Sequence, residues 1–218
     1  LVIEAMTQGL NEKTPGILGS GAVNQILDFA SKCNALAMGP GLGTNEATQE
    51  VIREVLRKLD LPVVIDADAI TALKDHLDIL NEMQAPKVIT PHVGEMARLT
   101  GLEAAEIEAN RLEMAYKYAK EWNAVIVLKG APTIIGTPSG NIYINPTGSS
   151  CMATGGAGDI LTGMIISLLG QGISVDQAAI CAVYLHGLAG QKATGGARGL
   201  AASEIAEEIP GILHEYLL

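Results

Sequence analysis

The sequence has 218 residues, of which 48% are hydrophobic and 17% are charged, and its formal net charge is −10. This length and composition suit one large α/β domain over residues 1–218 better than two small domains. The negative net charge argues against general nucleic-acid binding, which requires a basic surface. No run reaches the roughly 18 apolar residues that a membrane span requires, and no signal-peptide pattern occurs.

The three cysteines, Cys33, Cys151 and Cys181, are far apart and odd in number. This pattern favours reduced thiols in a cytoplasmic protein over a framework of disulfides.

Short apolar runs alternate with helical patterns, which is typical of a mostly parallel sheet flanked by helices. Strands are predicted over residues 35–38, 62–65, 87–90 and 125–128, and a hairpin over residues 133–135 and 142–144. Helices are predicted over residues 45–59, 160–169, 175–193 and 202–217. No repeat, low-complexity tract or linker divides the chain. In such sheets the ligand binds beyond the carboxyl ends of the strands, so the residues after the four strands should meet in one crevice.

A glycine-rich segment, residues 145–163 (NPTGSSCMATGGAGDILTG), lies between a short β pattern and an apolar helix. Glycine allows the backbone to approach a ligand closely, and a helix N-terminus offers unpaired N–H groups to an anion. The phosphate-binding loop is therefore predicted at Gly155, Gly156, Ala157 and Gly158. Asp159 stands at the helix entrance, where a carboxylate is either a cap or a base.

Two further groups of residues follow predicted strands. The string GPGLG, residues 39–43, is either an ordinary tight turn or a place where backbone lies against a ligand. Asp68 is interpreted as the cap of a helix that begins near Ala69. Asp66 is left open to a structural role, a metal-bound water or a ribose hydroxyl.

Three charged or titratable residues are candidates at the next strand ends. His92 and Glu95 lie in TPHVGE, where His92 is equally well explained by a structural role or by a ligand contact. Glu95 is either a first-turn residue favoured by the helix dipole or a residue that holds Mg²⁺ through water. Lys129 ends the strand AVIVL, and its charge suits phosphate. His186, inside an apolar helical run, is predicted to be a packed core residue.

No P-loop or Rossmann motif occurs. The strings GPGLG, TPHVGE, VLKG, NPTG and MATGGAGDILTGMI, in this order and spacing, resemble the ADP-dependent NAD(P)H-hydrate dehydratases of the ribokinase-like superfamily. The resemblance runs from about residue 35 to the C-terminus. Its GxGD part is shared with many ribokinase-like kinases, whereas the TPH and NPTG strings are more specific to the dehydratases.

The resemblance implies a ribokinase-like, three-layer α/β fold and the ADP-dependent return of hydrated NADH or NADPH (NADHX or NADPHX) to NADH or NADPH. Asp159 would then be the catalytic base and would also bind substrate, together with Gly41, Gly43 and His92. The residues implied in nucleotide binding are Lys129, Gly130, Ala131, Pro132, Thr133, Gly155, Gly156, Ala157 and Gly158. Mg²⁺ and ADP, or ATP, are the implied cofactor and co-substrate.

The resemblance also implies a homo-oligomer and a fused or separate hydrate epimerase. Two departures stand out. The family usually has roughly fifty more residues ahead of this start, so a fragment or a shortened N-terminus is expected. In addition, Val93 stands where Pro is common, and Pro132 stands where Gly is usual and removes one backbone N–H.

Two other functions remain open from the sequence. A ribokinase-like, ATP-dependent kinase of a small vitamin-precursor alcohol would use the same anion loop and base, but would release its phosphorylated product intact. A non-catalytic nucleotide sensor is disfavoured by the presence of Asp159 and Lys129.

Overall fold

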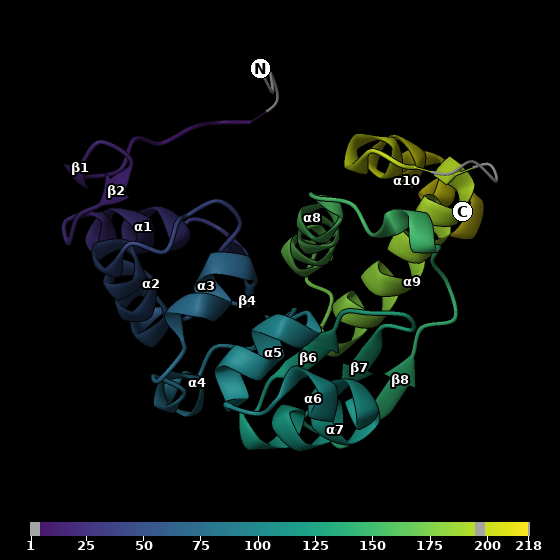
Figure 1. The fold of residues 1–218 in the computed structure, drawn as a ribbon. Helices are drawn as coiled ribbons and strands as arrows, with labels where there is room; N and C mark the ends of the chain where they lie inside the picture. The colour runs from purple at the N-terminus through teal and green to yellow at the C-terminus, as the bar shows by residue number, and fades with distance from the viewer. Residues whose placement is uncertain (1–4, 195–198, 218) are drawn as a thin grey trace.

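The computed structural model describes residues 5–194 and 199–217, which form a six-stranded sheet covered by helices (Figure 1). The strand order follows the chain: β3 (Leu36–Met38), β4 (Val63–Ile65), β5 (Lys87–Ile89), β6 (Val125–Leu128), β7 (Ile134–Gly136) and β8 (Ile142–Ile144). The first four strands are parallel, and β7 and β8 are antiparallel to their neighbours. All six strands were predicted from the sequence.

Helices cover both faces of the sheet. One core contains α1 (Ala22–Ala30), α2 (Glu46–Lys58), α3 (Ala67–Ala72), α4 (Asp78–Glu82), α5 (Val93–Thr100), α6 (Ala104–Ala109) and α7 (Arg111–Glu121). The other contains α8 (Ala157–Gly170), α9 (Val175–Thr194) and α10 (Ala202–Leu217). Val63 and Ile65 belong to the first core and Val64 to the second, because successive strand residues point to opposite faces. The predicted three-layer α/β fold is confirmed.

Burial on both faces explains why the parallel strands are continuous apolar runs rather than alternating ones. Every residue of β4, β5 and β6 is buried, including Lys87 at the start of β5. Among the described residues, no helix is long and apolar enough to cross a membrane.

Three elements near the N-terminus were not predicted. The strands β1 (Glu12–Thr14) and β2 (Ile17–Leu18) form a separate two-stranded sheet, and α1 follows them. β1 is polar and fully exposed and β2 has only two residues, so neither gives the hydrophobic pattern of a strand. A 3₁₀ turn, η1 (Ser150–Met152), was also missed within the glycine-rich segment.

Backbone hydrogen bonds bring the carboxyl ends of the parallel strands to one edge. The N–H of Asp66 donates to Met38 O at 3.0 Å, and the N–H of Thr90 donates to Ile65 O at 3.1 Å. His92 and Lys129 form an isolated parallel bridge beyond β5 and β6. The loops after β3, β4, β5 and β6 therefore start side by side.

Candidate functional site

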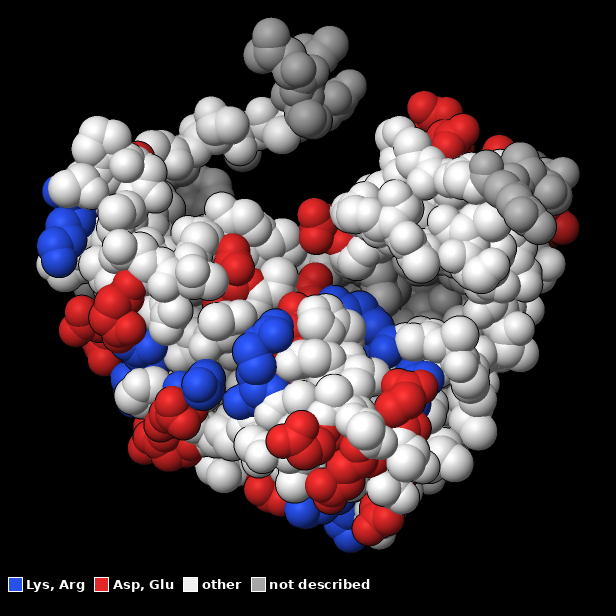
Figure 2. Space-filling view, in the orientation of Figure 1, with Lys and Arg blue, Asp and Glu red and all other residues white. Residues whose placement is uncertain are grey.

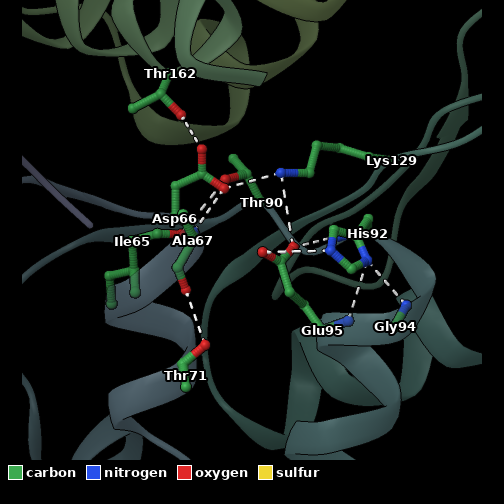
Figure 3. A network of polar contacts seen from close by, with 10 residues as sticks. All are labelled: Ile65, Asp66, Ala67, Thr71, Thr90, His92, Gly94, Glu95, Lys129 and Thr162. Carbon is green, nitrogen blue, oxygen red and sulfur yellow. Dashed lines mark hydrogen bonds and ion pairs between the residues drawn. The ribbon is translucent and has the colours of Figure 1, made fainter. Parts of the chain in front are cut away.

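Asp66 is the centre of a polar network at this edge of the sheet (Figure 3). Its side chain, which is 1% exposed, accepts a hydrogen bond from Lys129 Nζ at 2.9 Å and one from the Ala67 N–H at 2.9 Å. Its second oxygen accepts from Thr162 Oγ1 at 2.7 Å. One buried carboxylate thus joins the loop after β4, the residue after β6 and the helix α8.

The helix after β4 is capped by Asp66 and not by Asp68. The prediction for Asp68 was wrong because α3 begins at Ala67, two residues earlier than expected, and Asp66 is its N-cap. Asp68 lies in the first turn of α3, and its Oδ2 accepts a hydrogen bond from the Gly43 N–H at 2.8 Å. Asp68 therefore fixes the end of the GPGLG loop against α3.

The GPGLG loop has a conformation that requires glycine. Gly39, Gly41 and Gly43 all have positive φ. A Cβ at Gly39 would lie 1.7 Å from the carbonyl oxygen of Asp66, so the loop packs directly on the backbone of the polar network. The turn is thus tied to the network by backbone packing as well as by the hydrogen bond from Gly43 to Asp68.

His92 and Glu95 form a capping box at the start of α5. His92 Nδ1 accepts from the N–H groups of Gly94 at 3.0 Å and Glu95 at 3.2 Å, while Glu95 Oε2 accepts from the His92 N–H at 2.8 Å. Because Nδ1 accepts hydrogen bonds, the proton of the neutral imidazole is on Nε2. The His92 side chain is 53% exposed. His92 thus has a structural role and also presents one edge of its ring to solvent.

Lys129 stands between two carboxylates and a helix N-terminus. Its Nζ lies 2.9 Å from Asp66 Oδ1 and 3.7 Å from Glu95 Oε2. A Cβ at Gly158 would lie 3.5 Å from the same Nζ, so the ammonium is next to the first turn of α8. The unpaired N–H groups and partial positive charge of that turn, together with Lys129, favour an anion.

The glycine-rich segment enters α8 earlier than expected. Gly156, with φ +89°, is the N-cap and makes no side-chain hydrogen bond. Ala157, Gly158 and Asp159 already lie within the first turn of the helix. The sequence placed this helix three residues too late, because Gly158, within the first turn, has a low intrinsic helix propensity.

Asp159 is exposed and makes no hydrogen bond or ion pair in the part of the chain that the structure describes. It lines a cavity of about 400 Å³ between α8, α9 and α10, whose other lining side chains are mostly apolar. Of the two roles left open by the sequence, capping is therefore not observed. The carboxylate is free to meet a ligand.

The loop between β6 and β7 lies beside the same edge. Gly130, Ala131 and Pro132 are exposed, and Thr133 Oγ1 donates to Gly130 O at 3.1 Å. Figure 2 shows a hollow between the α1–α3 side and the α8–α10 side, with acidic and basic side chains at its floor. The structure thus brings the residues implicated by the sequence to one region.

Residues 2–211 match the model of the family described as NAD(P)H-hydrate dehydratase. The chain belongs to the NAD(P)H-hydrate dehydratase family. The bifunctional NAD(P)H-hydrate repair enzyme Nnr of Moorella thermoacetica is 45% identical over 212 residues, which are 96% of this chain and 40% of that enzyme. The chain therefore spans about two fifths of the length of this curated relative.

Two solved structures show the fold of the family. A structure of the ADP/ATP-dependent NAD(P)H-hydrate dehydratase of Bacillus subtilis, co-crystallized with ATP/Mg²⁺ and soaked with CoA, has a TM-score of 0.75 at 36% identity. The match covers 84% of this chain and 66% of that one. A ribokinase-like superfamily protein of Enterococcus faecalis has a TM-score of 0.77 at 27% identity, over 92% of this chain and 69% of that one. The predicted ribokinase-like fold is confirmed.

Mg²⁺ is held in proteins by carboxylate oxygens, and this dehydratase-family chain has two buried carboxylates at the site, Asp66 and Glu95. Within the described residues, no group of three or more His, Cys, Asp or Glu side chains is arranged to hold a metal ion. Both oxygens of Asp66 already accept hydrogen bonds, whereas Glu95 Oε1 accepts none from the described residues and lies 3.6 Å from His92 Nε2. Mg²⁺ usually binds through one or two carboxylates, several waters and substrate phosphates. Glu95 fits that mode of binding.

Sequence reasoning left the role of Asp66 undecided and missed Thr162 altogether. Thr162 lies 96 positions from Asp66, and a lone Thr inside an apolar helix gives no local signal. His186 was predicted correctly as a core residue, since it is 9% exposed. Burial lowers the pKa of His186 to about 4, against a smaller opposite effect of a hydrogen bond with the Ala157 backbone.

Proposed function

We propose that this chain catalyses the ADP-dependent dehydration of NADHX or NADPHX to NADH or NADPH, with release of AMP and phosphate. The observation that carries the proposal is the position of Lys129 beside the first turn of α8, which also bears the exposed Asp159. A terminal phosphate bound at this turn would lie next to the Lys129 ammonium. The carboxylate of Asp159, which has no partner among the described residues, lies on the same turn. The names of the relatives from M. thermoacetica and B. subtilis support the same reaction.

In this mechanism Asp159 removes the proton from the hydroxyl group at C6 of the hydrated nicotinamide ring. The resulting oxygen attacks the terminal phosphorus of ADP, and AMP leaves. The lone pair of the ring nitrogen then expels phosphate from C6, and loss of a proton from C5 restores the dihydropyridine. General-base catalysis of this kind contributes roughly 10²–10⁴-fold.

Charge develops on the transferred phosphoryl group during the attack. Lys129 and the N–H groups at the start of α8 are positioned to offset it, and fixed donors of this kind contribute about 3–4 kcal/mol each. Mg²⁺, when bound through Glu95, water and phosphate, neutralises further phosphate charge.

We also propose roles for the remaining residues that the family resemblance implies in substrate and nucleotide binding. Gly41, Gly43 and His92 contact the hydrated nucleotide, and residues 129–133 line the phosphates and sugar of ADP or ATP. His92 Nε2 is available as a donor because Nδ1 is already an acceptor within the capping box. The hydrogen bond from Gly43 to Asp68 holds the GPGLG loop in place for this contact.

We also propose a location, an assembly state and a partner enzyme for this protein. We expect a cytoplasmic homo-oligomer that works with a hydrate epimerase, and the bifunctional repair enzyme of M. thermoacetica supports a fusion of the two activities in relatives.

The test is an assay of the complete natural protein with acid-generated NADHX, Mg²⁺ and ADP, ATP or no nucleotide. The near-ultraviolet absorbance of NADH should return only with nucleotide, and one phosphate should be released per NADH. No recovery from protein that still binds nucleotide would overturn the dehydratase proposal. Stable phosphorylation of a pyrimidine or thiazole alcohol by ATP would instead identify a small-molecule kinase.

A further inference from the structure

Arg111 lies buried beneath the loop that the proposed function assigns to nucleotide binding. It is the first residue of α7 and is 7% exposed. Its Nη2 donates to the carbonyl oxygen of Leu128 at 3.2 Å. Leu128 is the last residue of β6, so the guanidinium is anchored directly before Lys129 and Gly130.

The contact between Arg111 and Gly130 explains why residue 130 is glycine. A Cβ at Gly130 would lie 2.2 Å from Arg111 Nη2, 2.6 Å from Cζ and 2.7 Å from Nη1. The φ angle of Gly130 lies outside the left-handed region, so its backbone conformation does not itself require glycine. The glycine is needed because the guanidinium occupies the space of a side chain.

The charge of Arg111 is poorly neutralised by its neighbours. Its nearest carboxylate is Glu108, with 3.7 Å between Nη1 and Oε1, and the Glu108 side chain is 60% exposed. Nε is buried and has no partner among the described residues. The N-terminus of α7 adds partial positive charge of the same sign. A buried, weakly paired cation is costly for folding, but it favours an anion that binds nearby.

We propose that Arg111 is a positioning residue of the nucleotide site. Its guanidinium supports the backbone of Gly130 from beneath, and its charge increases the affinity of residues 129–133 for a nucleoside polyphosphate. The inference rests on the proposed function for the identity of this loop. It adds a residue on α7 to a site otherwise built from strand ends and α8.

The test compares Arg111→Lys with Arg53→Lys in the complete protein. Arg53 is a matched control: it is 8% exposed, donates to the Ala72 carbonyl at 3.2 Å and pairs with an exposed carboxylate, Glu46, on α2. ADP binding is measured by calorimetry, the KM for ADP and kcat by the NADHX assay, and folding by thermal denaturation. Arg111→Lys should raise the Kd and KM for ADP about tenfold with little change in kcat, because the bonds of a planar guanidinium are lost.

Arg53→Lys should lose stability but keep wild-type affinity for ADP. Equal ADP affinity in the two folded variants would overturn the role of Arg111 and leave the proposed function intact. A wild-type protein that binds neither ADP nor ATP would overturn both.

A double-variant cycle provides a second test. Gly130→Ala should weaken ADP binding because the new Cβ displaces the guanidinium. Arg111→Ala should then weaken binding far less in the Gly130→Ala background than in the wild type. Additive losses in the two variants would show that the two residues act independently and would overturn the inference.

Discussion

Lys129 and Asp66 form an ion pair that crosses the end of an intervening strand. The two residues are 63 positions apart, with 2.9 Å between Nζ and Oδ1. Asp66 follows β4 and Lys129 follows β6, and β5 lies between them in the sheet. The hydrogen bond from Thr162 attaches α8 to the same carboxylate. The position of the ammonium at the start of α8 therefore depends on three elements at once.

Lys129→Ala should weaken ADP binding and destabilise the protein. Asp66 is 1% exposed, so it would keep two hydrogen bonds but lose its cation. Removing one partner of a buried ion pair costs about 3–5 kcal/mol, and the partial exposure of Lys129 favours the lower value. Calorimetry with ADP and urea unfolding measure the two effects. Lys74→Ala, at an exposed lysine after α3, is the control, and unchanged ADP affinity would remove Lys129 from the site.

Asp159→Asn should greatly reduce turnover and preserve ADP binding. The substitution keeps the shape of the side chain but removes the base, so kcat should fall by about 10²-fold or more. The melting temperature should fall only slightly, because Asp159 is exposed, makes no polar contact within the described residues and interacts favourably only with the partial positive charge of the first turn of α8. Asp176→Asn, at an acidic residue in the first turn of α9, is the matched control. Near-normal turnover of the Asp159→Asn variant would contradict the mechanism.

Two substitutions at His92 separate its capping role from its proposed substrate contact. His92→Ala removes the cap of α5 and should cost about 1 kcal/mol of stability, whereas His92→Asn retains an acceptor suited to capping. Both variants lose the Nε2 donor, so both should raise the KM for NADHX. A normal KM in the folded Asn variant would leave His92 with its structural role alone. Urea unfolding measures the change in stability, and the NADHX assay measures the KM.

The sequence predicted those parts of the fold that depend on local patterns. The apolar runs that became β3 to β6, and the bounds of α10, needed only hydrophobic periodicity. The network around Asp66 could not be predicted, because its bonds join residues 63 and 96 positions apart. Asp66 and Asp68 both fit a helix cap, and only the observed start of α3 separates them. The interpretation of residues 1–218 as a single domain stays a prediction.

The glycines of the GPGLG loop should differ in their tolerance of a side chain. Gly39→Ala places a Cβ 1.7 Å from the carbonyl oxygen of Asp66 at φ +138°, so it should destabilise the protein by more than about 3 kcal/mol. At Gly41, φ is +73° but no atom lies within 4 Å, and Gly41→Ala should cost only about 1–2 kcal/mol. Urea unfolding of the two variants measures the difference. Equal losses would mean that backbone conformation, rather than packing on Asp66, requires glycine at position 39.

Acid should destabilise the protein through His186. Burial lowers its pKa from 6.5 to about 4 in the folded state, so between these values the unfolded chain binds more protons than the folded one. The stability associated with neutral His186 is therefore complete above about pH 6.5 and is lost as the pH falls toward about 4. With about 1.4 kcal/mol per pKa unit, the total loss is about 3 kcal/mol.

His186→Leu should remove this part of the pH dependence. Leucine is apolar and of similar size, and Nε2 of His186 has no hydrogen-bond partner within the described residues, so little is lost at neutral pH. Urea unfolding at about pH 5 and about pH 7 should show a smaller difference for His186→Leu than for the wild type. His214→Gln, on the exposed side of α10, should keep the wild-type difference. The hydrogen bond with the Ala157 backbone favours the protonated form, so the loss of stability in acid comes from burial of the charge and not from this contact. A pH dependence of the same size in His186→Leu as in the wild type would contradict the assignment to His186.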